Sequence, residues 1–221
     1  MNRSATAWWA CLGTIGSELS ALATVVLSMP LRPLFAADEF DPRAPHPTPV
    51  LLVHGFLGDP TNFLVLRRFL SARGVRNFVS FRYGPGLDVV RLASRLCRAI
   101  DAVRASTGAP QVDIVAHSLG GLVARRVVKR YRGVHRLVTL GAPCIGGAIA
   151  PQEIAVFGDA DLLVPVPRVA HGRQGRLVVL PGCGHLGLLY APAALREVAA
   201  HLATPVEDRT LPPAPQPLKA A

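Results

Sequence analysis

The sequence predicts an α/β domain with a mainly parallel sheet of about six strands and helices on both faces. Short apolar runs bounded by Gly or Pro recur along the chain, and longer segments with a 3.6-residue period lie between most of them. The runs are continuously apolar rather than alternating, as expected for strands buried on both faces. With 221 residues, half of them apolar, the chain can build one core of moderate size but not two ordinary enzymatic domains.

The elements follow from this pattern in chain order. Strands are expected at residues 50–53, 78–81, 112–116, 136–140, 154–157 and 177–180. Helices are expected at residues 61–72, 88–106, 119–131 and 191–202. The connection from Leu140 to Ile154 is barely long enough for a parallel crossover, so we expect no substantial lid.

Composition shifts divide the chain into three parts. We expect an apolar leader or membrane anchor with a Pro-rich linker at 1–45, the α/β domain at 46–204 and a Pro-rich disordered tail at 205–221. Residues 5–30 contain a single charge, Glu18, and are long enough to cross a bilayer, which takes about 20 residues.

This stretch has three interpretations: a cleaved secretory signal, an uncleaved signal anchor, or an amphipathic segment packed on the domain. The first two together are favoured over the third, although the stretch is only weakly hydrophobic in its middle. They predict an exported (periplasmic or secreted) or membrane-anchored protein, with association through residues 5–30, rather than a cytoplasmic one.

The net charge of +10 does not predict nucleic-acid binding, because the basic residues are mostly spread out and aromatic residues are scarce. One cluster of basic residues lies on the polar side of the expected helix 119–131 and just after it. We interpret this cluster as a solvated helix face in preference to a surface attracted to an anionic membrane. Its members are Arg125, Arg126, Lys129, Arg130 and Arg132. The cysteines have no zinc-binding spacing, and a disulfide between Cys144 and Cys183 stays open.

A serine at a strand-to-helix turn is the strongest functional signal. Residues 111–121 read QVDIVAHSLGG, which is the G-x-S-x-G elbow with Ala116 in the first glycine position. Such a turn projects Ser118 at the start of a helix, where the N–H of Leu119 is available to an oxyanion. A helix N-cap serine followed by glycines for close packing is the structural alternative.

An acyl-transfer serine needs a base, an orienting acid and a second oxyanion donor. His185 follows the last predicted strand, at the same sheet edge as Ser118, and is the best base. Asp159 and Asp161 both follow the strand 154–157. Asp161 is the preferred acid, because it stands just before an apolar turn and is better placed for burial, and Asp159 is the reserve. The second donor is the N–H of Phe56, in the turn after the first strand.

Other polar residues near these motifs have structural interpretations. His54 is expected to brace the turn that carries Phe56. Asp113 lies inside the strand before the elbow, His135 and His201 are badly placed for a base, and His171 lies in a loop before the last strand.

Together these residues resemble the α/β-hydrolase family, and most closely its small lidless bacterial triacylglycerol lipases. The resemblance covers about residues 48–203 and rests on VHGFLGDPTNF, VDIVAHSLGGLVAR, LVTLGAP, DADLLVP and GCGHLGLLYAP. It implies an α/β-hydrolase fold, a triad of Ser118, Asp161 and His185, and oxyanion donors at Phe56 and Leu119. Phe56 stands where a smaller aliphatic residue is frequent, and the segment 142–152 is shorter than in most relatives.

The sequence therefore predicts a serine hydrolase that cleaves carboxylic esters, with a small-molecule or lipid ester as substrate and no metal or cofactor. Apolar residues near the site favour an acyl chain, although core packing would also explain several of them: Leu57, Phe63, Ile145, Leu186 and Leu188. The alternatives are an acyltransferase or deacylase acting on a lipid-linked substrate at the membrane, and a non-catalytic interaction protein with this fold.

Overall fold

The structure, a computed structural model, describes residues 3–28, 30–31, 40–144, 150–167 and 175–203. Its centre is one six-stranded sheet with the order β2-β1-β3-β4-β5-β6. Every neighbouring pair of strands is parallel, which confirms the predicted parallel sheet. The carboxyl ends of all six strands therefore lie at one edge, where ligand sites of open α/β sheets form.

All six predicted strands are present, and their ends differ from the expected ones by two residues at most. They are β1 (Val50–Val53), β2 (Phe78–Phe81), β3 (Val112–His117), β4 (Val134–Leu140), β5 (Glu153–Gly158) and β6 (Arg176–Leu180). The central strands β1, β3 and β5 are buried along their whole length. Burial on both faces explains why these runs are apolar without alternation.

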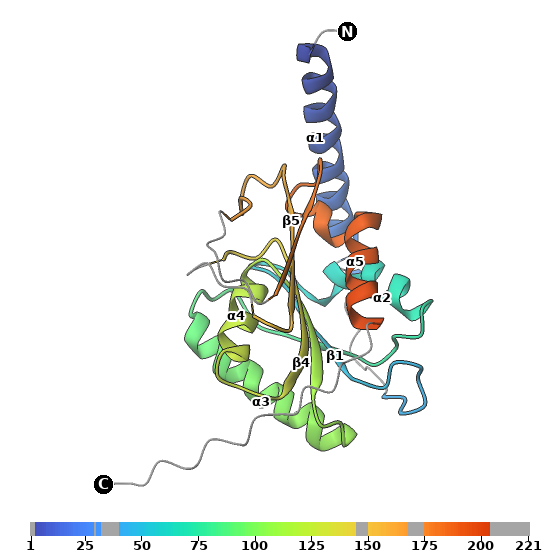
Figure 1. Cartoon of the computed structure of the whole chain (residues 1–221), viewed down its shortest axis with the longest axis vertical. Coiled ribbons are helices and arrows are strands. Elements are labelled where there is room, and N and C mark those ends of the chain that lie inside the picture. The colour runs from blue at the N-terminus through green and yellow to red at the C-terminus, as the bar shows by residue number, and fades with distance from the viewer. Residues whose placement is uncertain (1–2, 29, 32–39, 145–149, 168–174, 204–221) are drawn as a thin grey trace, which may run out of the picture.

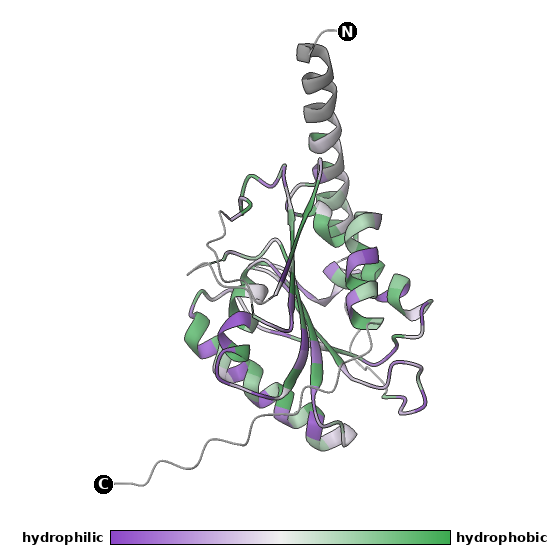
Figure 2. Ribbon diagram, viewed as in Figure 1, coloured by the Kyte–Doolittle hydropathy of each residue, from purple (hydrophilic) through white to green (hydrophobic). Residues whose placement is uncertain are grey.

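Helices cover both faces of this sheet (Figure 1). On one face α3 (Val89–Thr107) and α4 (Leu119–Val128) pack on β1 and β3 and form one buried apolar cluster with them. On the other face α2 (Leu64–Ser71) and α5 (Pro192–Ala203) contribute to a second buried apolar cluster. The predicted helix at 61–72 divides into a 3₁₀ turn, η2 (Pro60–Phe63), followed by α2. Figure 2 shows hydrophobic and hydrophilic residues mixed along the covering helices, as amphipathic packing requires.

The N-terminal segment is a single helix, α1 (Arg3–Ser28), which extends from the body of the molecule (Figure 1). Its C-terminal part contacts η2 and the short helix η3 (Gly187–Leu189). No helix among the described residues has the length and hydropathy of a membrane-crossing segment. The predicted tail at 205–221 lies outside the described residues.

Arg125 is an exception to the predicted solvated face of α4. It is buried, and its guanidinium contacts Glu153 (Nε–Oε1, 2.8 Å) and donates to the carbonyl oxygens of Ala142 and Pro143. Its helix position faces the sheet, and the ion pair offsets the cost of burying the charge. Cys144 and Cys183 are both thiols here, so the disulfide left open above is not formed.

Candidate functional site

Ser118 stands between β3 and α4 with a strained backbone. Its φ is 52° and its ψ is −122°, values that L-residues rarely adopt. Gly120 makes the bend feasible, because an added Cβ there would overlap the carbonyl oxygens of Val53 and His54. The Ser118 N–H donates to the carbonyl oxygen of Leu140 (2.9 Å), which fixes the elbow to the end of β4.

His185 and Asp161 form a buried hydrogen-bonded pair. The Nδ1 atom of His185 lies 2.7 Å from Oδ2 of Asp161, whose side chain is fully buried. The other carboxylate oxygen accepts the N–H groups of Leu163 (2.9 Å) and Val164 (2.8 Å). Burial raises the pKa of Asp161, but the His185 bond and these N–H groups outweigh it and hold this pKa below its usual value.

This pair lies over the end of β4, beside the serine elbow. A Cβ added at Gly141 would come within 3.1 Å of His185 Nδ1 and 3.2 Å of Asp161 Oδ2, so the glycine leaves room for both. His117, the residue before Ser118, packs its ring on that of His185 with 4.7 Å between the centroids. The structure thus brings the three predicted side chains to neighbouring positions at one sheet edge.

His117 was not singled out from the sequence, although it sits in the elbow motif. Its Nε2–H donates to the carbonyl oxygen of His185 (3.2 Å). This bond ties the elbow to the loop at residues 181–187 that carries His185, here called the histidine loop. Burial, and then the neighbouring His185, lower the pKa of His117 to about 3, so this ring is neutral at neutral pH.

The predicted oxyanion turn lies on the other side of Ser118. Gly58 donates its N–H to the carbonyl oxygen of Gly55 (3.1 Å), which closes a four-residue turn with Leu57 at a positive φ of 56°. A Cβ added at Gly55 would lie 3.0 Å from that of Ser118, so the backbone of this turn touches the serine. The N–H groups of Phe56 and Leu119 therefore come from two turns that meet at Ser118.

The remaining candidates lie elsewhere. The reserve acid, Asp159, is exposed and accepts the N–H of Gly182 (2.7 Å). His201 contacts the carbonyl oxygen of Gln152 (3.2 Å), and His171 lies outside the described residues.

Asp113 lies at the opposite edge of the sheet and is fully buried. Its carboxylate pairs with the side chains of His46 (3.0 Å), His135 (3.2 Å) and Arg136 (3.3 Å). The distance of this edge from Ser118 agrees with the structural role expected for Asp113.

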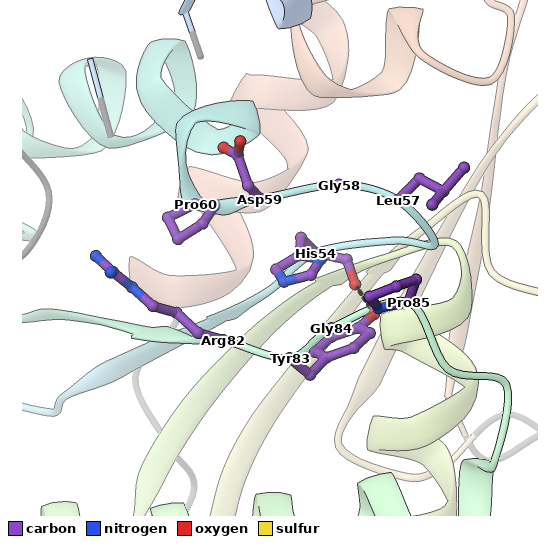
Figure 3. A pocket seen from close by; sticks show the side chains of 9 residues that line it. All are labelled: His54, Leu57, Gly58, Asp59, Pro60, Arg82, Tyr83, Gly84 and Pro85. Carbon is purple, nitrogen blue, oxygen red and sulfur yellow. Dashed lines mark hydrogen bonds between the residues drawn. The ribbon is translucent and has the colours of Figure 1, made fainter. Parts of the chain in front are cut away.

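A cavity of about 370 Å³ adjoins the oxyanion turn at the ends of β1 and β2. Figure 3 shows the ring of His54 between Tyr83 and the segment of Asp59 and Pro60. The rings of His54 and Tyr83 stack with 4.1 Å between centroids, and the Tyr83 hydroxyl donates to the His54 carbonyl oxygen. Burial lowers the pKa of His54, so this residue braces the turn as a neutral ring.

Exposed apolar side chains surround the site. Phe56 and Leu57 on the oxyanion turn are 48% and 69% exposed. Leu162 and Leu163 are 96% and 74% exposed, and they lie on the loop at residues 159–164 that carries Asp161, here called the acid loop. Two residues predicted to favour an acyl chain, Phe63 and Leu188, are instead fully buried in the core. Leu186 is half-buried, and Ile145 lies outside the described residues.

The loop that carries His185 also contacts α1. Glu18 accepts the backbone N–H groups of Leu186 (3.0 Å) and Gly187 (2.6 Å). The sequence shows Glu18 as the single charge in an apolar stretch, but nothing local indicates its partner. Burial, and secondarily the Glu18 charge, raise the pKa of the Cys183 thiol in this loop to about 11.

The comparisons with known proteins agree with this architecture. A family model for class 2 lipases matches residues 47–146, the part with the oxyanion turn and the elbow. A predicted CIB-like hydrolase from Thermoplasma acidophilum is 17% identical with a TM-score of 0.58, covering 72% of this chain and 87% of that one.

Two further solved structures are similar. A putative hydrolase of the α/β superfamily from Xanthomonas campestris pv. campestris is 22% identical with a TM-score of 0.54, covering 70% and 95% of the two chains. A membrane phospholipase A, described as a bacterial virulence factor, is 15% identical with a TM-score of 0.56, covering 91% of this chain and 98% of its own. These likenesses show the α/β-hydrolase fold.

Proposed function

We propose that this chain, a class 2 lipase-like α/β hydrolase, cleaves carboxylic esters through Ser118, His185 and Asp161. The observation that carries the proposal is the buried 2.7 Å bond between His185 and Asp161, next to a serine held at φ 52°. A carboxylate on Nδ1 fixes the tautomer that leaves Nε2 of His185 to take a proton from the serine hydroxyl.

The reaction follows from these positions. Ser118 Oγ attacks the ester carbonyl carbon while His185 takes the hydroxyl proton, and the N–H groups of Phe56 and Leu119 stabilise the oxyanion. Collapse of the intermediate expels the alcohol, which receives the proton from His185. Water, activated by His185, then cleaves the acyl-enzyme, and Asp161 stays ionised throughout.

The exposed apolar residues around the site support an ester with an apolar acyl chain. Phe56, Leu57, Leu162 and Leu163 flank the site from the oxyanion turn and the acid loop. The β4–β5 connection is short in the sequence, which supports a rim that solvent or a lipid surface can reach. Export or membrane anchoring through residues 5–30 remains a separate proposal, which fractionation of the full chain from its host would test.

The test is hydrolysis of p-nitrophenyl esters from C2 to C16 by the wild type and Ser118→Ala. We expect the variant to lose at least about a thousandfold in kcat/KM without unfolding, because the nucleophile is gone. Full activity in Ser118→Ala would overturn the proposal. Ester formation with an added alcohol in place of hydrolysis would instead favour an acyltransferase.

A further inference from the structure

Glu18 makes a polar contact between α1 and the domain that apolar packing alone would not provide. It is the one charged residue between Arg3 and Arg32, and its carboxylate points at the domain rather than at solvent. Each carboxylate oxygen takes one backbone N–H, from Leu186 and Gly187, the two residues that follow His185. Hydrogen bonds from N–H groups to a carboxylate are stronger than those between neutral groups.

The histidine loop is shaped to receive this carboxylate. A Cβ added at Gly184 would lie 2.5 Å from Glu18 Cδ, and one added at Gly187 would lie 3.0 Å from Oε1. The two glycines that bracket His185 and Leu186 therefore let the carboxylate reach the backbone. Any larger residue at Gly184 would displace Glu18.

Two further contacts hold α1 against both halves of the site. The Thr14 hydroxyl donates to the carbonyl oxygen of Gly182 (3.3 Å), at the start of the histidine loop. The buried Ser28 hydroxyl lies 3.1 Å from Oγ1 of Thr61, which donates in turn to Asp59, directly after the oxyanion turn. One helix thus spans the loop that carries the base and the segment that follows the oxyanion donor.

We propose that Glu18 is a positioning residue, which holds the backbone after His185 so that α1 must be docked for full activity. The inference rests on the proposed ester hydrolase function for its kinetic consequence, but not for its structural one. Without the carboxylate, the N–H groups of Leu186 and Gly187 lose their partners, and the loop that aims His185 at Ser118 loosens. Small misplacements of a base slow the chemical step more than they weaken substrate binding.

The test compares the full-length wild type with Glu18→Gln, which keeps the shape but turns an NH₂ group toward one of the two donors. We expect amide exchange at residues 186–187 to speed up about tenfold, as one charge-assisted bond is lost. We also expect kcat on a short-chain p-nitrophenyl ester to fall about tenfold with little change in KM.

Two control variants isolate this effect. Leu19→Ala changes an exposed neighbour on α1, and Glu197→Gln removes a carboxylate of α5 that pairs with Arg176 (3.0 Å). Both should retain wild-type exchange at 186–187 and wild-type kcat. Thermal melting of each variant verifies that the domain stays folded.

The outcomes are separable. Unchanged exchange at residues 186–187 in Glu18→Gln would overturn the positioning role, whatever the activity. Faster exchange with a wild-type kcat would overturn the link to catalysis. Failure of the ester hydrolase proposal would appear elsewhere, as full activity in Ser118→Ala, and leaves the exchange comparison to decide on Glu18.

Discussion

The ring of His117 packs on the ring of His185, with 4.7 Å between centroids and 47° between planes. The pKa of His117 is lowered to about 3, by burial first and by His185 second, so the ring carries no charge at neutral pH. A neutral neighbour does not repel the imidazolium that forms on His185 during proton transfer. The residue before the nucleophile thus supports the base without competing for its proton.

Stability should therefore fall in mild acid. The folded pKa of His117 lies below its usual value of 6.5, so the unfolded chain binds a proton that the folded protein excludes. The stability it contributes is present above pH 6.5 and is lost as the pH falls toward 3.

We expect the protonation of His117 to account for a loss of about 2 kcal/mol in unfolding free energy between pH 7 and pH 5. His117→Phe should have a flatter dependence, because the phenyl ring cannot take up the proton that unfolded His117 binds. Urea unfolding at pH 5, 6 and 7 measures both, and equal slopes would contradict the assignment.

Replacing the acid should separate the two aspartates of the loop. Asp161→Asn removes the charge on Nδ1 of His185, and we expect kcat/KM to fall by about 10³- to 10⁴-fold. Asp159→Asn keeps an oxygen for the N–H of Gly182 and should stay close to the wild type. Ester hydrolysis by the two variants, side by side, checks this, and a larger loss in Asp159→Asn would reverse the roles.

The strain at the elbow should be measurable as stability. Ser118→Ala keeps a Cβ at φ 52°, whereas Ser118→Gly removes it. Relief of strain exceeds the added entropy of an unfolded glycine, so we expect Ser118→Gly to be more stable than Ser118→Ala by about 1 kcal/mol. Both should be inactive on esters. Chemical denaturation of the pair is the measurement, and equal midpoints would mean that the backbone is unstrained.

The glycine two residues after the serine should tolerate no side chain. In Gly120→Ala the new methyl group would overlap the carbonyl oxygens of Val53 and His54, and backbone cannot move aside cheaply. We expect a loss of about 3 kcal/mol in stability, together with activity. Gly86→Ala is the matched control, since nothing lies within 4 Å of a Cβ there. Similar melting temperatures for the two variants would argue against the close approach.

The sheet could be predicted because each strand is marked by a pattern within a few neighbouring residues. Runs such as 50–53 and 154–157 are apolar, short and close to Gly or Pro, and burial on both faces of the sheet explains their composition. The proximity of Asp161 to His185 was predictable from chain order, because both residues follow parallel strands at one edge. The sequence also favours Asp161 over Asp159, because Asp161 stands just before an apolar turn; in the structure Asp161 bonds His185, whereas Asp159 accepts the N–H of Gly182.

Two side chains, Arg125 and Glu18, have partners that the sequence does not indicate. Arg125 lies among basic residues that face solvent, and only the position of Glu153 on β5 reveals that it is buried. The partners of Glu18 are backbone N–H groups, which every residue but proline has, so no side-chain pattern could indicate them.

The bonds from Glu18 to Leu186 and Gly187 join residues 168 and 169 positions apart. They lie outside the hydrogen-bonded sheet, so they can open while the sheet stays folded. These bonds should therefore form late in refolding and break early on warming. Heating would then inactivate the enzyme before it melts the sheet, so that its working temperature range is narrower than its range of folded stability.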